Sequence, residues 1–490
     1  MVESLRAIAA IPELRNRVLF TLAMLAVFRF GSHIPTPGVN TEALRVFAEQ
    51  AKDTMFGFYD MFSGGNLSNA TIFALGVMPY ISASIILQLL TIVWPYLERL
   101  SKEGELGRRK ITQYTRYSTI GLSLVQAAAY AYTLEQQSNT IGGLPIVGSP
   151  GIGFVLTTML TMTTGSVFVM WLGEQITERG IGNGMSLIIF AGIVSNLPGA
   201  VLRTLDQLKT GQIGLIRLAF IVAMMVGVVA AVIFVERGHR RVTVQYAKRL
   251  VGKRVAGGTS THIPLKVNTG GVIPVIFASS LLAFPATLAG LTAPDSWVRS
   301  LTDALRYGEP LYLLLFVTGI LFFAYFYTSI VFNPDDVAEN MRKYGGFVPG
   351  IRPGKRTAEY MDAILSRITL VGAAYLALIS LLPIILFSGL KVANLPFIGD
   401  ALQQALPEFL MAGFKVAPIP IIGGPLDAFF TENGLGWITE GLHLNFYFGG
   451  TSILIVVGVA MDTVQQVESQ LIMRHYDSFM KKTRIRGRRG

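Results

Sequence analysis

The chain of 490 residues contains no cysteine and few charged residues. The absence of cysteine excludes disulfide bonds, thiolate metal sites and a cysteine nucleophile. Charged residues make up 14% of the sequence, whereas a soluble protein usually carries about 25%. The charges lie in loops between long uncharged stretches, as a bilayer requires, because charge is costly in hydrocarbon. The composition therefore indicates a polytopic membrane protein rather than several soluble domains.

The sequence also lacks the short motifs of catalysis, nucleotide binding and ion coupling. It has no G-x-x-x-x-G-K-[ST] phosphate loop, H-E-x-x-H helix or nucleophile elbow. Its five histidines are scattered, so no metal site is expected. No Asp or Glu falls in the middle of a predicted span, where ion-coupled transporters usually keep such residues. We therefore expect no enzymatic activity and no cofactor, and any work on a substrate must come from a partner.

Ten apolar stretches are long enough to cross a bilayer as helices, which takes roughly 20 residues each. Helices are favoured over strands because a continuous helix satisfies its own backbone in lipid. The predicted spans are residues 18–34, 72–94, 117–133, 152–172, 181–201, 215–235, 271–291, 311–332, 368–387 and 448–472.

Lysine and arginine are distributed unequally between the two sides of the predicted membrane. Most of the 41 basic residues lie on the side that holds both termini, which the positive-inside rule assigns to the cytoplasm. Two long loops on that side, 236–268 and 333–367, and the tail 473–490 are strongly basic. Such loops suit an acidic or RNA-bearing cytoplasmic partner. The alternative is that they only orient the chain and contact anionic lipid.

Two stretches far apart in the chain resemble each other. Residues 76–84 read GVMPYISAS and residues 271–279 read GVIPVIFAS, in the second span of each predicted five-span half. Five spans per half give the halves opposite orientations, and inverted repeats place a pathway at their interface. Pro79 and Pro274 lie inside the predicted spans, which predicts a kink or hinge in each helix. A chance match and a static kink are the alternatives.

Several long strings resemble the SecY/Sec61-alpha family of channel subunits along nearly the whole chain. They include RFGSHIPTPG at 29–38, FALGVMPYISASIILQL at 73–89, WLGEQITERGIGNG at 171–184 and FVPGIRPG at 347–354. The resemblance implies an all-α polytopic membrane protein with ten transmembrane helices. They would form two inverted five-helix halves, 1–205 and 206–490, as a clamshell with a central pore and a plug.

The resemblance also implies four sets of site residues. A pore ring would consist of Val77, Ile81, Met185, Ile189, Ile276 and Ile455. A plug at 55–66 would use Met55, Phe56, Phe58, Met61, Phe62, Gly64 and Gly65. A lateral gate would involve Pro79, Gln88, Gln126, Asn268 and Pro274, and a docking surface Lys253, Arg254 and Arg352. Ordinary packing, or solvated charge at the docking residues, is the alternative for each of them.

The function that follows from the resemblance is a protein-conducting channel. It would translocate unfolded secretory polypeptides across the bacterial cytoplasmic (inner) membrane and release signal and transmembrane segments laterally. Expected partners are SecE and SecG, the SecA ATPase, the ribosome, preprotein signal sequences, SecDF, YidC and membrane lipids. A secondary transporter of a small solute and a structural scaffold are the alternative classes. An outer loop at 390–444 is longer than the family usually needs, and no function is predicted for it.

Overall fold

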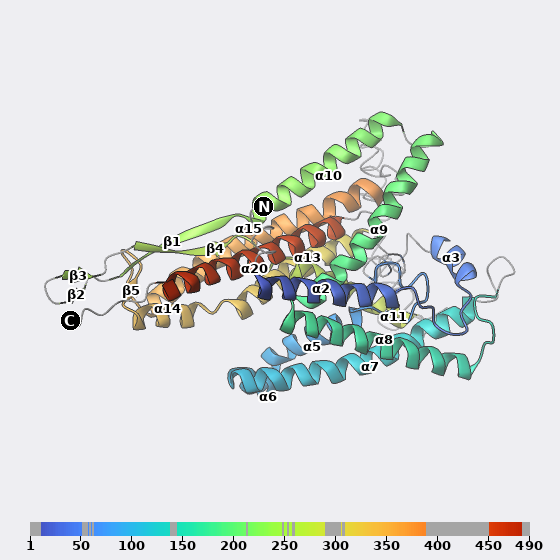
Figure 1. Ribbon diagram of the computed structural model, residues 1–490, viewed down its shortest axis with the longest axis horizontal. Helices are drawn as coiled ribbons and strands as arrows, with labels where there is room; N and C mark the ends of the chain where they lie inside the picture. The colour runs from blue at the N-terminus through green and yellow to red at the C-terminus, as the bar shows by residue number, and fades with distance from the viewer. Residues whose placement is uncertain are drawn as a thin grey trace, which may run out of the picture. The chain divides into compact units, whose positions relative to one another are not determined.

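The computed structural model of the protein is mostly helical in the residues that it describes (Figure 1). It describes residues 11–482 apart from 51–56, 58–59, 61–62, 138–144, 212–213, 247–248, 252–253, 257–259, 290–304, 306–308 and 389–449. Several predicted features therefore lie outside the described residues. These are the plug residues Met55, Phe56, Phe58, Met61 and Phe62, the docking residue Lys253 and the outer loop 390–444.

Each of the ten predicted spans coincides with one helix of the structure. These helices are α2 (Pro12–Gly31), α5 (Met78–Val93), α7 (Glu105–Gln137), α8 (Ile152–Arg179), α9 (Gly184–Lys209), α10 (Leu215–Glu236), α11 (Ile273–Ala289), α13 (Pro310–Val331), α15 (Lys355–Ser388) and α20 (Gly450–Lys482). The shorter helices are α3 (Thr41–Gln50), α6 (Pro95–Lys102) and α14 (Pro334–Lys343).

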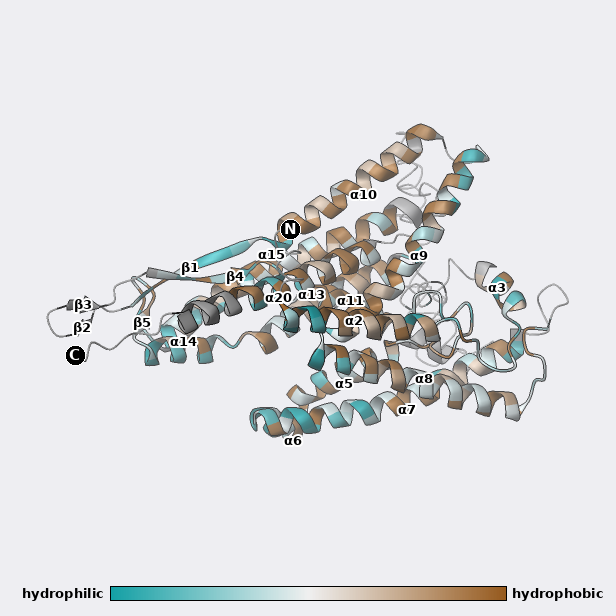
Figure 2. Cartoon of the chain, in the orientation of Figure 1, coloured by the Kyte–Doolittle hydropathy of each residue, from teal (hydrophilic) through white to brown (hydrophobic). Residues whose placement is uncertain are grey.

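By length and hydropathy alone, five helical stretches within the described residues could each cross a membrane. They are α8, α9, most of α10, α13 continued through α14, and α15. A sixth results if α5 and α6 form one broken span, because the chain bends by 97° between them. Figure 2 shows the difference in hydropathy directly, with α10 largely hydrophobic and α6 largely hydrophilic.

Contacts divide the chain into two compact units. Unit 1 consists of Met1–Arg203, Ala283–Asp303 and Val459–Gly490, and unit 2 of Thr204–Leu282 and Ala304–Gly458. The division falls near the predicted boundary at residue 205 but assigns the end of α20 to unit 1.

In unit 1, α7 packs along α8, α5 packs on α7 and α2 packs on α8. The segment before α5 is held in this bundle by Phe73, whose ring stacks between Phe28 of α2 and Phe168 of α8. The ring centroids are 5.8 and 5.9 Å apart. A Cβ on Gly165 of α8 would lie 1.8 Å from the carbonyl oxygen of Ile72. Only glycine therefore allows this segment to lie against α8, which fixes where α5 begins.

In unit 2, α15 packs against both α13 and α14, and Phe277 of α11 meets Phe323 of α13 edge-on at 5.7 Å. The predicted cytoplasmic loops 236–268 and 333–367 are not irregular. They contain the strands β1 (His239–Tyr246), β2 (Arg249–Val251), β3 (Arg254–Ala256), β4 (Ser260–Lys266) and β5 (Gly346–Phe347).

One small sheet joins the two loops. Its strand order is β4-β1-β5, with β1 antiparallel to both neighbours. Strand β1 turns Val242 and Val244 inward and leaves Arg240 and Arg241 exposed. The inward face forms a hydrophobic core with residues of β4, α14 and α15, including Leu265. The expectation of an all-α protein thus holds for the spans, while these loops form a small α/β body of their own.

The predicted proline kinks inside the second and seventh spans are wrong. Pro79 and Pro274 lie in the first turn of α5 and α11, because these helices begin at Met78 and Ile273, later than the predicted starts at residues 72 and 271. Proline is suited to this position, since its missing N–H would have no intrahelical partner there. The prolines therefore mark helix starts rather than hinges within helices.

The internal repeat extends from sequence to backbone conformation. Gly76 and Gly271 have left-handed φ angles of 54° and 58°, a region that glycine adopts readily. In each unit a backbone bond then follows, from Ile81 N to Val77 O at 3.0 Å and from Ile276 N to Val272 O at 3.2 Å. The two helix starts are thus built alike, as an inverted repeat requires.

Candidate functional site

The candidate ring residues lie at or near the starts of α5, α9, α11 and α20, and nearly all of them are buried. Exposure is 5% or less for Val77, Ile81 and Ile189 in unit 1 and for Ile276 and Ile455 in unit 2. Met185 is half-buried, and a Cβ on Gly173 of α8 would lie 2.5 Å from its sulfur. The pore ring itself stays a prediction.

The described end of the candidate plug contains a buried acid that sequence reasoning missed. Asp60 is 7% exposed, and its carboxylate accepts a hydrogen bond from the Ser68 N–H at 2.8 Å. Burial raises the pKa of the Asp60 carboxyl, while the bonds from Ser68 oppose that rise. The candidate plug residues Gly64 and Gly65 follow with left-handed φ angles of 77° and 83°, which fits a tight turn.

The candidate gate residues have polar partners close by. Gln88 donates from Nε2 to Ser84 Oγ on its own helix at 3.1 Å. Asn268 is 6% exposed and donates from Nδ2 to Glu236 Oε1 at 2.6 Å and to the Gly271 carbonyl at 3.0 Å. Gln126 is 4% exposed. Asn268 is thus tied within unit 2, between the end of α10 and the start of α11.

Glu236 is a further residue that sequence reasoning missed. It is 7% exposed and ends the apolar helix α10. The signal in the sequence was weak, because a carboxylate at the cytoplasmic end of a span is ordinary. Its partner Asn268 is 32 residues away, beyond the reach of any local pattern.

The candidate docking residue Arg352 lies on a rigid exposed turn. Gly350 and Gly354 on either side have left-handed φ angles of 81° and 110°. The carbonyl of Arg352 accepts a bond from Thr357 Oγ1 at 3.0 Å, and the preceding Ile351 packs against the core of the loop sheet. Arg254 lies in β3, at the far end of the other loop.

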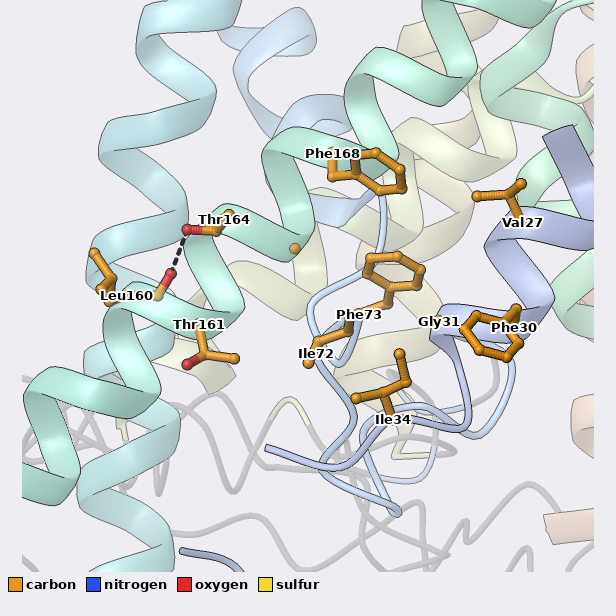
Figure 3. A pocket seen from close by; sticks show the side chains of 11 residues that line it. Val27, Phe30, Gly31, Ile34, Ile72, Phe73, Leu160, Thr161, Thr164 and Phe168 are labelled. Carbon is orange, nitrogen blue, oxygen red and sulfur yellow. Dashed lines mark hydrogen bonds between the residues drawn. The ribbon is translucent and has the colours of Figure 1, made fainter. Parts of the chain in front are cut away.

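Unit 1 also has an apolar groove between α2 and α8 (Figure 3). Its volume is about 530 Å³. Phe30 on one wall and Leu160 on the other are 74% and 71% exposed. The hydroxyl groups of Thr161 and Thr164 donate to carbonyl oxygens of α8 itself. The groove therefore presents a hydrocarbon surface, and Gly31 and Gly165 are small residues in its lining.

Comparison with known proteins bears directly on these features. A model of the SecY family matches residues 71–402. The protein translocase subunit SecY of Escherichia coli (strain K12) is 45% identical over 478 residues, which is 97% of this chain and 96% of the relative. The chain belongs to the SecY family.

Solved structures agree with the fold of this SecY-family chain. One is described as a protein-conducting channel, and another concerns the plug domain of SecY, said to stabilise the closed state of its translocation channel. Each has a TM-score of 0.58 and 16% identity and covers 96% of this chain and 94% of its own. The SecY fold accounts for the ten helices and the repeated helix starts, and it makes the chain a multi-pass membrane protein.

Proposed function

We propose that the chain is the channel subunit through which unfolded secretory polypeptides cross the cytoplasmic (inner) membrane. Signal and transmembrane segments would leave it laterally into lipid, and both termini would lie in the cytoplasm. The observation that carries the proposal is its 45% identity, over almost the full length of both chains, to a protein translocase subunit. The positive-inside distribution of Lys and Arg supports the orientation.

Physical reasoning supports an aliphatic ring as the seal of such a channel. A narrow apolar constriction dewets, so that ions meet a desolvation barrier. Non-directional apolar contacts also close around many passenger sequences, whereas a polar ring would bind particular side chains and hold water. Val77, Ile81, Ile189, Ile276 and Ile455 are buried aliphatic residues, which is what such a ring needs.

A stalled secretory chain should crosslink to a cysteine introduced at Ile81 or Ile276. The native chain has no cysteine, so each Ile→Cys variant carries one unique thiol. Ile216→Cys serves as a control, because Ile216 is 88% exposed on α10. Crosslinks at both ring positions and none at the control are expected. If the stalled chain reached neither ring position, the proposal would be rejected.

We further propose that the groove between α2 and α8 receives an apolar helix of a small partner subunit, SecE or SecG. Helices associate in lipid through van der Waals packing, and the groove offers a lining of mostly apolar side chains for such packing. Exposed apolar side chains on both walls support the proposal, because a partner helix would bury them.

A single cysteine at Leu160 should crosslink to that partner subunit in membranes. Leu314→Cys on α13 is a matched control, because Leu160 and Leu314 are 71% and 65% exposed on apolar helices of different units. Strong crosslinking at 160 and none at 314 is the expected pattern. Equal crosslinking at both, or at 314 alone, would mean that the groove is not the docking site.

The two basic loops would form the docking surface for the SecA ATPase and the ribosome. One sheet joins the loops, so that a partner would bind one folded surface rather than two independent loops. Exposed Arg240, Arg241 and Arg352 offer planar donors suited to carboxylates and to RNA phosphates.

A further inference from the structure

The segment between the candidate plug and α5 is built around one buried carboxylate. Asp60 Oδ1 accepts from Ser68 N at 2.8 Å and from Ser63 Oγ at 3.4 Å. Its backbone carbonyl accepts from Gly65 N at 2.9 Å and from Ser63 Oγ at 3.0 Å. One acidic residue therefore closes a turn that reaches eight residues along the chain.

The turn has a second layer of hydrogen bonds within itself. Ser63 Oγ accepts from Leu67 N at 3.2 Å, and Asn66 Nδ2 donates to the Ser63 carbonyl. Ala70 N donates to Leu67 O, and Thr71 N to Asn66 O. These bonds define a compact turn, Ser63–Ala70, which we call the anchor turn.

Two helices of unit 1 hold the anchor turn from outside. The hydroxyl of Tyr130 on α7 donates to Leu67 O at 2.8 Å. On the other side, Gly64 lies against Gly192 of α9, and a Cβ on Gly64 would be 2.6 Å from the Gly192 Cα. Gly192 follows the candidate ring residue Ile189 by one turn of that helix. The anchor turn is therefore seated directly beside the predicted constriction.

We propose that Asp60 is a positioning residue that fixes the anchor turn on α7 and α9, so that this end of the plug stays in place. The proposal rests on the proposed function, because it takes residues 55–66 to be the plug. A carboxylate buried among backbone and hydroxyl donors is costly to leave unpaired, so Asp60 and the turn stabilise each other. While the anchor turn keeps its contacts with α7 and α9, the closed state of the channel is favoured. When these contacts are lost, the plug no longer stays in its closed position.

Asp60→Ala should raise the resting ion conductance of the channel in planar bilayers by roughly tenfold, because it leaves the Ser68 N–H without its acceptor. Asp60→Asn retains an oxygen at the same place, so its conductance should stay near that of the unchanged protein. This contrast separates the acceptor role from simple presence of a side chain. Equal conductance of the Ala variant and the unchanged protein would overturn the proposal.

A second pair of variants independently tests the contact between Gly64 and α9. Gly64 and Gly104 have the same left-handed φ angle of 77°, so alanine strains the backbone equally at both positions. A Cβ at Gly64 clashes with the backbone of Gly192, whereas a Cβ at Gly104, outside the candidate plug, meets nothing within 4 Å. Gly64→Ala should therefore leak ions and Gly104→Ala should not. Equal leakage of the two variants would contradict the claim that this contact with α9 keeps the channel closed.

Deletion of residues 55–66 separates a failure of this inference from a failure of the proposed function. If the deletion variant does not leak, the plug itself is rejected. If it leaks while Asp60→Ala and Gly64→Ala conduct like the unchanged protein, the plug role of residues 55–66 is kept and the positioning role of Asp60 is rejected. If Asp60→Ala fails to fold, the Gly64 and Gly104 pair decides the question.

Discussion

Arg352→Glu is expected to reduce motor-driven export of a preprotein by at least about tenfold without lowering the thermal stability of the protein. Truncating or reversing one partner of a desolvated charge pair typically costs about 2–5 kcal/mol of binding, which exceeds a tenfold effect. The side chain is exposed, so folding gains little from it. Export into proteoliposomes or inverted vesicles, measured together with thermal unfolding, gives both quantities.

The rigidity of the turn is the reason for expecting so large an effect from one surface residue. Ile351 N donates to the Val348 carbonyl at 3.1 Å, and Val348 belongs to the core of the loop sheet. The guanidinium is thus carried on a backbone that is ordered before the partner arrives, which lowers the entropy cost of binding. Arg352→Lys keeps the charge but loses the planar fork, so it should give an intermediate loss.

Arg356→Glu is the matched control. Arg356 is also exposed, in the first turn of α15, and its reversal changes the net charge of the loop by the same amount. Little change in export is expected. An equal loss in both variants would assign the effect to the general charge of the loop, and normal export in Arg352→Glu would reject the docking role.

The membrane helices could be predicted because span length and hydropathy are properties of a continuous run. The exact helix starts could not, because they depend on tertiary contacts. The run from residue 72 is apolar throughout, yet α5 begins at Met78. The preceding residues are held by the stacking of Phe73 and by the close approach of Ile72 to Gly165. The proline within the run therefore suggested a kink where there is a helix start.

The strands in the cytoplasmic loops were missed for a different reason. Strand β1 reads HRRVTVQY, in which only the two inward valines are aliphatic, so the strand offers a short apolar pattern. Its pairing with β5 joins residues about a hundred positions apart, and no local signal encodes that contact. The basic character of the loops was predictable, whereas the body that orders Arg352 was not.

The site residues likewise divide into those that could be predicted from the sequence and those that could not. Ring, plug and gate positions followed from family resemblance, and they stay predictions. Asp60 and Glu236 were not anticipated, because their importance lies in their buried partners. An acid reads as a surface residue in sequence, and only the structure reveals the donors around it.

Replacing Glu236 should destabilise unit 2 and loosen the start of α11. Glu236→Ala removes the acceptor of the 2.6 Å bond from Asn268 and leaves a buried amide without it. Hydrogen bonds to charged groups contribute about 1.5–3 kcal/mol, so we expect a loss of about 2 kcal/mol in unfolding free energy. Glu236→Gln keeps an oxygen acceptor and should lose less. Denaturant or thermal unfolding in detergent measures both.

A double-mutant cycle with Asn268→Ala isolates the pair. If the two residues act through their mutual bond, the double variant should be less destabilised than the sum of the single variants, by about 1 kcal/mol or more. Glu359→Ala on the exposed face of α15 is a control and should change stability by less than about 0.5 kcal/mol. Additive losses would show that Glu236 and Asn268 contribute separately.

The same cycle decides what Asn268 does in the gate. An amide already bonded to Glu236 and Gly271 has little left to donate to another helix, so its main role would be to set the position of α11. Strong coupling to Glu236 together with altered signal-sequence release in both single variants would establish that indirect role. If Asn268→Ala changed release while Glu236→Ala did not, the amide would act on the gate directly. The hydrogen bond between Asn268 and Glu236 would then serve only to stabilise unit 2.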